Sequence, residues 1–285
     1  MAELREVAFT TRLRVPVGDV AERQAILIEG PAGWGEYSPL PSWSEDERAA
    51  AKRAAIESAT EPFPPAARAR IEINALVPRV APEQAARMAA ASRCNTIKIK
   101  VGDAASVERV RAVREALPRA RIRLDANGAW DPGTAGIFLA QVRGLDIELI
   151  EDPVPTLEEM ARFRRGSAVL VAAESCVRTV EDARMLRKLD AADAIVIKPQ
   201  RIGGARAALD AADEAGVPAI ASSALETSVG LAMVAAVAAA LPDAPFAHEV
   251  GTAGLLERDV TSDPLRPVDG AMEPRRVAPD LVIDG

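Results

Sequence analysis

The chain has 285 residues, of which 49% are hydrophobic and 27% charged, a composition typical of a soluble globular protein with a sizeable core. Its formal net charge of −7 argues against nucleic-acid binding, because proteins that bind nucleic acids usually present basic surfaces. Aromatic residues make up only 3% of the chain, which provides neither base-stacking platforms nor an aromatic belt for a membrane.

The N-terminal stretch predicts a small antiparallel sheet. Polar and apolar residues alternate over residues 4–15 and again over residues 24–29, as in strands with one buried face. Residues 16–19, Pro-Val-Gly-Asp, have the composition of the turn between these strands. A Gly/Pro-rich loop is then expected over residues 30–44.

A single helix is expected after this loop. Ser44 precedes three acidic residues and is a favourable N-cap, because its hydroxyl can accept a backbone N–H at the helix start. We expect the helix to continue to about Ser58. The Pro-rich segment 61–65 ends it and is the best candidate for a domain boundary, so residues 1–68 are assigned to an N-terminal α+β domain.

From residue 69 onward the pattern changes to strands that alternate with helices. Segments with the composition of strands occur at residues 71–77, 96–102, 121–126, 147–151, 169–174, 194–198, 217–222 and 246–250. Helices are expected from residue 82, at 104–117 and 132–142, from residue 156, and at 179–189, 204–215 and 227–241. Units of this kind build parallel sheets through right-handed crossovers, and eight of them close into a barrel. The predicted fold class is α/β, a modified TIM (β/α) barrel over residues 69–250.

The rest of the sequence gives expectations about location and partners. Residues 251–285 have no partner helix and are expected to return to the N-terminal domain. Cys94 and Cys176 match neither a metal-ligand spacing nor a disulfide framework, which suits a reducing cytosol. The N-terminus has no apolar signal core, and the longest apolar run, residues 228–241, is too short to span a bilayer. We therefore expect a cytoplasmic monomer that acts on a small molecule and binds neither nucleic acid nor membrane.

The strand at residues 96–102, with the sequence TIKIKVG, indicates a functional site. Three aliphatic residues face one way in this strand, while Lys98 and Lys100 face the other. In a parallel sheet covered by helices the aliphatic face meets the helices, so both lysines point inward. Buried ammonium groups are costly unless carboxylates compensate them. The strand therefore predicts that carboxylates lie nearby.

Matching carboxylates end three successive predicted strands. Asp125, Glu151 and Glu174 end the third, fourth and fifth strands, and Lys198 ends the sixth. Functional groups of a barrel gather at the C-terminal ends of its strands, so these side chains should form one ring with the lysines. Oxygen ligands of this kind suit Mg²⁺, for which Mn²⁺ can substitute.

Each of these residues also has a simpler explanation. A strand-ending carboxylate is often a helix cap or a solvated charge, and Asp152, next to a proline, can simply shape a turn. The ring also fits a Schiff-base aldolase in which Lys198 attacks a carbonyl, or a barrel retained only for binding. His248 is the only histidine, so proton chemistry would fall to lysines or carboxylates. The joint placement at one end of the barrel favours a catalytic site.

The ordered motifs resemble those of the enolase superfamily, muconate-lactonizing subgroup. They are KIK, LDAN, IEDP and IKPQRIGG, together with a carboxylate at the end of the fifth strand. The resemblance extends from GWGEYSPLP near the N-terminus to the last turn. It implies a capping domain, built from the N-terminal region and the C-terminal tail, that closes over a modified barrel. It also implies that Asp125, Glu151 and Glu174 bind Mg²⁺.

Within this subgroup, residues 222–231 and 248–260 are most similar to the o-succinylbenzoate synthases of menaquinone biosynthesis. The resemblance implies dehydration of 2-succinyl-6-hydroxy-2,4-cyclohexadiene-1-carboxylate to o-succinylbenzoate through an enediolate. Lys100 would be the base and then the acid, and Lys198 would stabilise the enediolate from the opposite side. The residues implied to bind substrate are Lys98, Arg123, Ser222 and Ser223.

Racemases of N-succinylamino acids and dipeptide epimerases carry similar segments and are the alternative. In those reactions Lys100 and Lys198 would act as two bases on opposite faces of the substrate. The elimination needs only one base, so the ring of charges does not separate the two activities.

One departure from the family pattern concerns the fifth strand. The family usually has Asp-Glu-Ser there, whereas this chain has Glu174, Ser175 and Cys176. Strand parity aims Glu174 inward, which makes it the expected third metal ligand. Residues 16–19 and 38–44 are expected to form a lid over the site, because Gly/Pro-rich loops of a capping domain suit that role.

Overall fold

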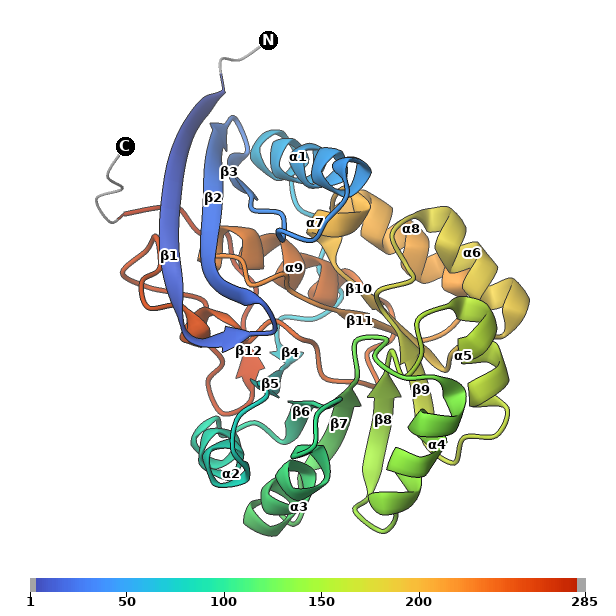
Figure 1. The fold of residues 1–285 in the computed structure, drawn as a ribbon. Coiled ribbons are helices and arrows are strands. Elements are labelled where there is room, and N and C mark those ends of the chain that lie inside the picture. Colours follow the sequence, from blue (N-terminus) through green and yellow to red (C-terminus); the bar gives the residue numbers. More distant parts are fainter. Residues whose placement is uncertain (1–3, 281–285) are drawn as a thin grey trace.

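The computed structural model describes residues 4–280, which form a small N-terminal part beside a larger barrel (Figure 1). The N-terminal part is an antiparallel sheet of β1 (Arg5–Val17), β2 (Val20–Gly30) and β3 (Gly33–Tyr37). One helix, α1 (Glu45–Thr60), packs on this sheet through β2 and β3. The predicted pair of strands and the helix after them are therefore confirmed.

The start of α1 follows from its first residues. Ser44 Oγ accepts the N–H of Glu47 at 3.3 Å, and the Glu47 carboxylate accepts the N–H of Ser44 at 2.7 Å, which together make a capping box. Strand β3, in contrast, lies where a loop was expected. Helix α1 runs so close to it that a Cβ at Gly35 would collide with the backbone oxygen of Ala55. This glycine therefore serves close packing of helix and strand.

Seven parallel strands form the main sheet, in the order in which they follow along the chain. They are β5 (Asn74–Val77), β6 (Thr96–Lys100), β7 (Arg121–Asp125), β8 (Ile147–Glu151), β9 (Leu170–Ala173), β10 (Ala194–Ile197) and β11 (Ala219–Ala221). The predicted eighth strand forms single bridges, from His248 to Ile73 and from Glu249 to Ser222. Because these bridges reach both edges of the sheet, they close the barrel as predicted.

Helices cover the outside of the curled sheet (Figure 1). They are α2 (Pro82–Ala91), α3 (Ser106–Ala116), α4 (Pro132–Gln141), α5 (Leu157–Arg164), α6 (Val180–Leu189), α8 (Ala205–Ala215) and α9 (Ser228–Ala240). A further short helix, α7 (Pro199–Ile202), was not expected. It starts with a proline, whose missing N–H costs nothing there, and ends at Gly203 with a φ of 110°.

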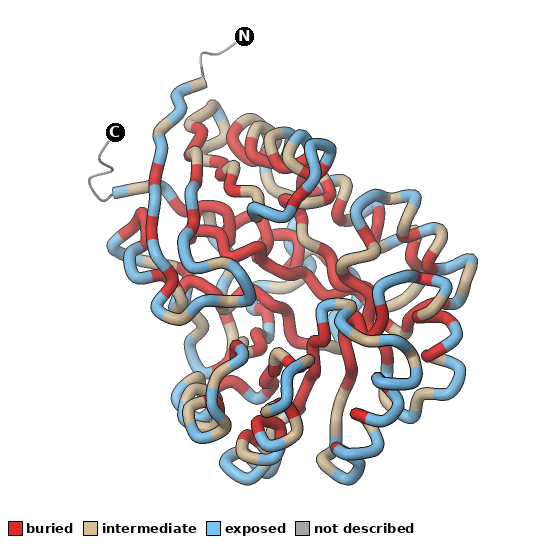
Figure 2. Tube along the Cα trace, in the orientation of Figure 1, coloured by how far each residue is buried: buried red, intermediate tan, exposed pale blue. Residues whose placement is uncertain are grey.

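Inward and outward positions alternate along the barrel strands as the sequence predicted, except at the start of β8, where the register shifts and Glu148 contacts the inward Arg123. The side chains that fill the interior below the site are Leu149, Ala172, Ala194, Val196 and Ile220, together with Phe246. Their neighbours Ile150, Val171 and Ile195 pack outward in the main core. Figure 2 shows these buried segments as a continuous band through the barrel. This parity decides which charged side chains reach the interior.

The Ala-rich run that the sequence singled out is α9. Every residue from Ser228 to Ala239 is buried, and the helix contacts β3 of the N-terminal part as well as β11 and α8 of the barrel. Across residues 4–280, no helix combines the length and the apolar character needed to cross a membrane.

The described part of the tail, residues 251–280, returns to the N-terminal sheet. Leu256 forms a bridge with Leu13, and the N–H of Glu257 donates to the oxygen of Arg12 at 2.9 Å. A short 3₁₀ turn, Ala253–Leu255, precedes these contacts. The tail also contacts the barrel, because β12 (Ala271–Met272) pairs with β4 (Ile71–Glu72), just before β5.

Candidate active site

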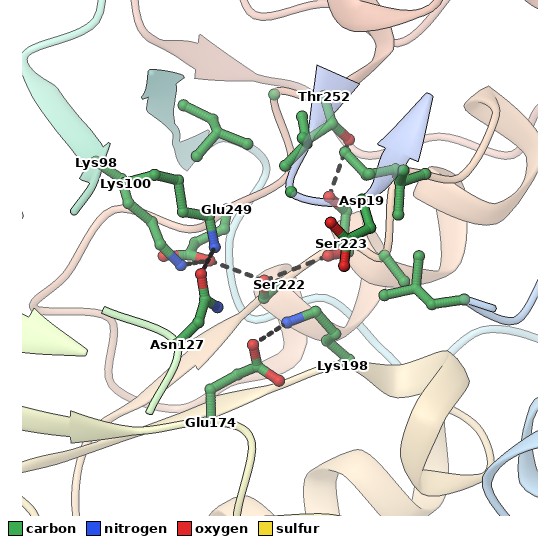
Figure 3. A pocket seen from close by; sticks show the side chains of 18 of the residues that line it. Asp19, Lys98, Lys100, Asn127, Glu174, Lys198, Ser222, Ser223, Glu249 and Thr252 are labelled. Atoms are coloured by element: carbon green, nitrogen blue, oxygen red, sulfur yellow. Dashed lines mark hydrogen bonds and ion pairs between the residues drawn. The ribbon is translucent and has the colours of Figure 1, made fainter. Parts of the chain in front are cut away.

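A cavity of about 530 Å³ lies between the C-terminal ends of the barrel strands and two loops of the N-terminal part. The loops contribute Val17 to Val20 on one side and Leu40 and Ser42 on the other. These are the segments predicted to form a lid. Figure 3 shows the charged side chains that meet in this cavity.

The register of the sheet places the charged residues in one row. Lys100 lies opposite Asp125 across β6 and β7, and Asp125 lies opposite Glu151 across β7 and β8. Glu151 in turn lies opposite Ala172, two residues before Glu174. Residues at equal height on neighbouring strands, with equal parity, must share the interior.

Lys98 lies at the centre of the carboxylates. Its Nζ lies 2.7 Å from Glu151, 2.9 Å from Asp125 and 2.7 Å from Glu249, and all four side chains are buried. Burial alone would lower the pKa of Lys98, but the charges of Asp125, Glu151 and Glu249 outweigh it and hold this pKa well above its usual value. Lys98 is therefore a permanent cation in this arrangement.

Lys100 reaches the cavity one position further along β6. Its Nζ lies 2.5 Å from Asp125 Oδ2 and 3.0 Å from Asn127 Oδ1, and 16% of its side chain is exposed. Asn127, with a φ of 51°, also donates its N–H to Asp125 Oδ1 at 2.9 Å. Burial opposes ionisation of Asp125, but Lys100 and Lys98 outweigh it and lower the pKa of this carboxyl.

Glu174 and Lys198 pair on the other side of the cavity (Figure 3). Arg201 lies 3.0 Å from the second oxygen of Glu174 and 2.6 Å from Glu47, the capping residue of α1. Burial opposes ionisation of Glu174, but Lys198 and Arg201 lower its pKa. This inward orientation agrees with the parity argument, and Arg201 connects the site to the N-terminal part.

The carboxylates fit a divalent cation. Oxygens of Glu151, Asp152 and Glu174 lie within 4.8 Å of one another, and all three residues are buried. Burial, followed by the charges of Asp125 and Glu249, raises the pKa of Glu151 well above its usual value, so this cluster gains from an added positive charge. Hard oxygen donors in such a group suit Mg²⁺.

Asp125 lies at a place that the sequence did not predict, whereas Asp152 has the role of shaping a turn that the sequence offered for it. Asp125 lies against Lys98 and Lys100 and outside the group of three, although Lys98 joins it to Glu151. Both oxygens of Asp152 accept backbone N–H groups, from Glu174 at 2.9 Å and Ser175 at 2.8 Å. Asp152 therefore fixes the end of β9, in line with its interpretation as a turn-shaping residue. Burial and then Glu174 raise its pKa to about 6.

The four residues expected to bind substrate separate into two groups. Lys98, Ser222 and Ser223 line the cavity. Ser222 Oγ donates to Glu249 at 2.8 Å, and Ser223 Oγ lies 2.9 Å from Thr252 Oγ1.

Arg123 is fully buried and does not line the cavity. It contacts Glu148 at 2.5 Å, donates to the oxygen of Ala247 at 2.7 Å and lies over the ring of Phe246. The alternation of side chains along β7 correctly predicted that Arg123 faces the barrel interior. The two-residue step back from Asp125, about 7 Å along the strand, places it in the lower part of the barrel.

Sequence reasoning missed Glu249. It contacts Lys98 and lines the cavity from the eighth strand segment, like the other strand-ending carboxylates. The same rule of strand-ending charges would have found it. His248, next to it, accepts the N–H of Ala221 at 3.1 Å, and burial lowers its pKa to about 4. A buried neutral imidazole in that role is structural.

A buried polar junction between the two parts was also missed. Arg23 donates to the backbone oxygens of Ser38, Pro39 and Leu225, and Glu36 accepts from Thr227 and Gly230. These contacts hold the second cavity loop at its base. Nothing in the local sequence around Arg23 on β2 distinguishes it from the exposed charges of the same strand.

Comparisons with known proteins agree with this arrangement. Residues 81–279 match the family model described as enolase C-terminal domain-like, and residues 6–59 match the enolase N-terminal domain-like model. The chain is 44% identical to an o-succinylbenzoate synthase of Thermobifida fusca, over 95% of this chain and 87% of the relative. It is 40% identical to that of Mycobacterium ulcerans, over 94% and 83%.

Solved structures share the fold at lower identity. An N-succinyl Arg/Lys racemase from Bacillus cereus superimposes with a TM-score of 0.84 at 20% identity, over 95% of this chain and 92% of that one. A muconate lactonizing enzyme from Pseudomonas fluorescens gives 0.83 at 19% identity, over 99% and 96%. With the fold, the site and these relatives in agreement, the chain belongs to the o-succinylbenzoate synthase family of the enolase superfamily.

Proposed function

We propose that this protein is a hydro-lyase that converts 2-succinyl-6-hydroxy-2,4-cyclohexadiene-1-carboxylate to o-succinylbenzoate, a step of menaquinone biosynthesis. The observation that carries the proposal is the placement of Lys100 and Lys198. Both ammonium groups line one cavity, next to carboxylates on either side of it. Family membership supplies the substrate, and the cavity supplies the groups that the reaction needs. The proposal includes a cytoplasmic location and a monomer.

The reaction begins with a proton on a carbon next to a carboxylate. Lys100, as the neutral amine, takes this proton, and the electrons left behind form an enediolate. The carbon–oxygen bond of the ring hydroxyl then breaks, and Lys100 returns the proton to the departing hydroxide, which leaves as water. The ring becomes aromatic, so one residue serves as base and then as acid.

The other two lysines stabilise charge. Lys98 stays protonated among its three carboxylates, so its positive charge lies next to the reacting part of the cavity. Lys198 lines the opposite side of the cavity, where its ammonium group would face the negative charge of the enediolate. Ser222 and Ser223 would contact the substrate beside them.

We propose that Asp125, Glu151 and Glu174 hold Mg²⁺, with Mn²⁺ as a substitute. A divalent cation bound there would stabilise negative charge on the substrate carboxylate. The support is the buried group of carboxylate oxygens around Glu151 and Glu174 and the shared contact of Asp125 and Glu151 with Lys98. Asp152 is not assigned as a ligand, because its two oxygens accept the backbone N–H groups of Glu174 and Ser175.

A turnover assay with purified protein tests the proposal. We expect conversion of the cyclohexadiene substrate with Mg²⁺, loss of activity with a chelator and recovery when Mg²⁺ is added back. Borohydride added during turnover should trap no adduct on Lys198, which separates this reaction from a Schiff-base mechanism. Absence of turnover with Mg²⁺ present would reject the proposed activity.

Racemisation of N-succinylamino acids is the second candidate. The observation that favours it is the same pair of lysines, since Lys100 and Lys198 reach the cavity from different strands and could act as two bases. Exchange of the α-hydrogen for deuterium in heavy water would reveal this activity. Equal rates for both substrates would make the protein bifunctional.

A further inference from the structure

Arg79 lies at the mouth of the cavity, in the connection between β5 and α2. Its Nε donates to the backbone oxygen of Val101 at 3.0 Å, one residue after Lys100. Its Nη2 lies over Gly102, where a Cβ would come within 3.0 Å of it. Gly102 has a φ of 104° and no side chain, which leaves room for the guanidinium beside it.

Arg79 differs from the other cations that line this cavity. Lys98, Lys100 and Lys198 each contact a carboxylate of the barrel. Among residues 4–280, no ion pair or further hydrogen bond holds the terminal nitrogens of Arg79. Asp103, which follows Gly102 in the chain and lies close enough to Arg79 for that charge to lower its pKa, instead contacts Arg109 through both of its oxygens, at 3.1 and 2.8 Å.

Arg79 is an exposed residue, and a purely structural role uses only part of its side chain. Holding the turn after β5 against β6 requires only the bond from Nε to Val101. The terminal edge of the guanidinium is the part that binds a carboxylate through two parallel hydrogen bonds. That edge is not used within the described chain, and Arg79 lines the cavity that holds the proposed catalytic lysines.

We propose that Arg79 binds the succinyl carboxylate of the substrate, an inference that rests on the proposed function. The substrate carries two carboxylates. The ring carboxylate has to lie beside Lys100 and the metal ligands, because the proton is removed next to it. The second, at the end of the succinyl chain, needs a cation whose terminal N–H groups no carboxylate of the barrel accepts, and among the described residues that line the cavity Arg79 is that cation.

The other residues that line the cavity fit a succinyl chain that extends from the substrate ring to Arg79. Leu76, from the same β5 segment, lines the cavity together with Val17 and Val20 of the first loop. These apolar side chains suit the two methylene groups of the succinyl chain. Ser223 and Thr252 are the competing site for a carboxylate, but their hydroxyls are neutral and lie 2.9 Å from each other.

The test compares two ligands and two variants, all with Mg²⁺ present. The ligands are o-succinylbenzoate and 2-butyrylbenzoate, in which a methyl group replaces the tail carboxylate. The variants are Arg79→Gln and, as a control, Arg87→Gln, an exposed arginine on α2. Titration calorimetry gives Kd for each pair, and steady-state kinetics give KM and kcat with the cyclohexadiene substrate.

We expect Arg79→Gln to weaken o-succinylbenzoate binding about ten- to a hundredfold and to raise KM similarly, with kcat nearly unchanged. Binding of 2-butyrylbenzoate should be equal in both proteins, and Arg87→Gln should behave like the wild type. Unchanged Kd for o-succinylbenzoate in Arg79→Gln, or an equal loss for both ligands, overturns the assignment while wild-type turnover continues. A wild type that neither converts the substrate nor binds the product overturns the proposed function as well.

Discussion

Lys98 and Lys100 are two residues apart on one strand, yet their surroundings give them different tasks. Lys98 is almost fully buried and touches three carboxylates, whereas Lys100 touches Asp125 and Asn127 and reaches the cavity. A cation that three carboxylates hold is a poor base, because its proton is stabilised. The proton chemistry therefore belongs to Lys100.

Replacing Lys100 by alanine should abolish catalysis without unfolding the protein. We expect kcat to fall by at least about 10³, the scale of losing a general base together with its charge. The melting temperature should change little, since this side chain is partly exposed at the cavity. Lys188→Ala, an exposed position on α6, is the matched control. Near-wild-type turnover of Lys100→Ala would show that Lys100 is not the base.

Replacing Lys98 should act through stability as well as activity. Lys98→Met keeps the volume but leaves Asp125, Glu151 and Glu249 buried without their shared cation. Breaking a buried ion pair in this way costs on the order of 3–5 kcal/mol. Thermal unfolding of the metal-free protein measures this loss, and Mg²⁺ should recover part of it. An unchanged melting temperature would show that the carboxylates do not need Lys98.

Glu174 is the third of the proposed metal ligands, and three variants test its role. Glu174→Ala should weaken Mg²⁺ binding and abolish activity, because it removes an oxygen donor from the buried group. Glu174→Asp should remain active, and Ser175→Ala should be mild, since Ser175 contributes its backbone N–H to Asp152. Magnesium titrations decide between these outcomes. Unchanged affinity in Glu174→Ala would exclude this residue as a ligand.

At the scale of elements, the two loops of the N-terminal part are the expected lid. Residues 16–19 and 38–44 border the cavity, and Arg23 fixes the base of the second loop. Hydrogen exchange should show both loops protected when o-succinylbenzoate binds, because closure excludes water. Helix α4, on the outside of the barrel, is the internal control and should not change. No added protection in either loop would contradict a lid.

The junction between loop and barrel also predicts a pH dependence of stability. Burial and then the charge of Glu36 raise the pKa of Glu226 to about 7. The folded state then binds more protons than the unfolded state between the ordinary carboxyl pKa and about 7. This contribution to stability is present at low pH and is lost as the pH rises through that window.

Glu226→Gln should remove this dependence. The glutamine keeps an oxygen for the N–H of Ala224, which donates to the carboxylate at 2.6 Å. Its stability relative to wild type should rise by on the order of 2–3 kcal/mol between about pH 5 and about pH 8. Denaturant unfolding at several pH values measures the difference, with the exposed Glu22→Gln as control. A difference that stays constant with pH would show that Glu226 has an ordinary pKa.

Local patterns predicted most elements because each strand and helix carries its own signal. The capping residues Ser44, Thr156 and Thr179 sit at the expected helix starts, and parity placed Lys98, Lys100 and Glu174 inward. The failures are of a different kind. β3 read as a loop because it contains two glycines, and only the tertiary structure reveals that Gly35 serves packing against α1.

At the scale of the whole molecule, local sequence patterns could not predict which charged side chains contact each other inside the barrel. The sequence indicates which residues face inward, but not how deep each lies or which partner it chooses. Arg123 turned out to lie below the cavity, and Asp125 lies against two lysines instead of the carboxylate group. Glu249, in contrast, lies in the predicted eighth strand, and the rule of strand-ending charges would have found it. These outcomes depend on the closed barrel.

The barrel and the N-terminal part meet at the cavity. Both parts contribute lining residues, and the tail holds them together through Leu13 and Leu256. The fold is shared with racemases and lactonizing enzymes, so it does not select the reaction by itself. Activity has to be measured with competing substrates.

The central claim is tested most directly by mass spectrometry of turnover in heavy water with Mg²⁺. The protein would receive the cyclohexadiene substrate and N-succinylamino acids in one mixture. We predict rapid loss of one water from the cyclohexadiene substrate to give o-succinylbenzoate, with slow or no deuterium uptake by the N-succinylamino acids. Deuterium exchange into the amino acids without formation of o-succinylbenzoate would contradict the account.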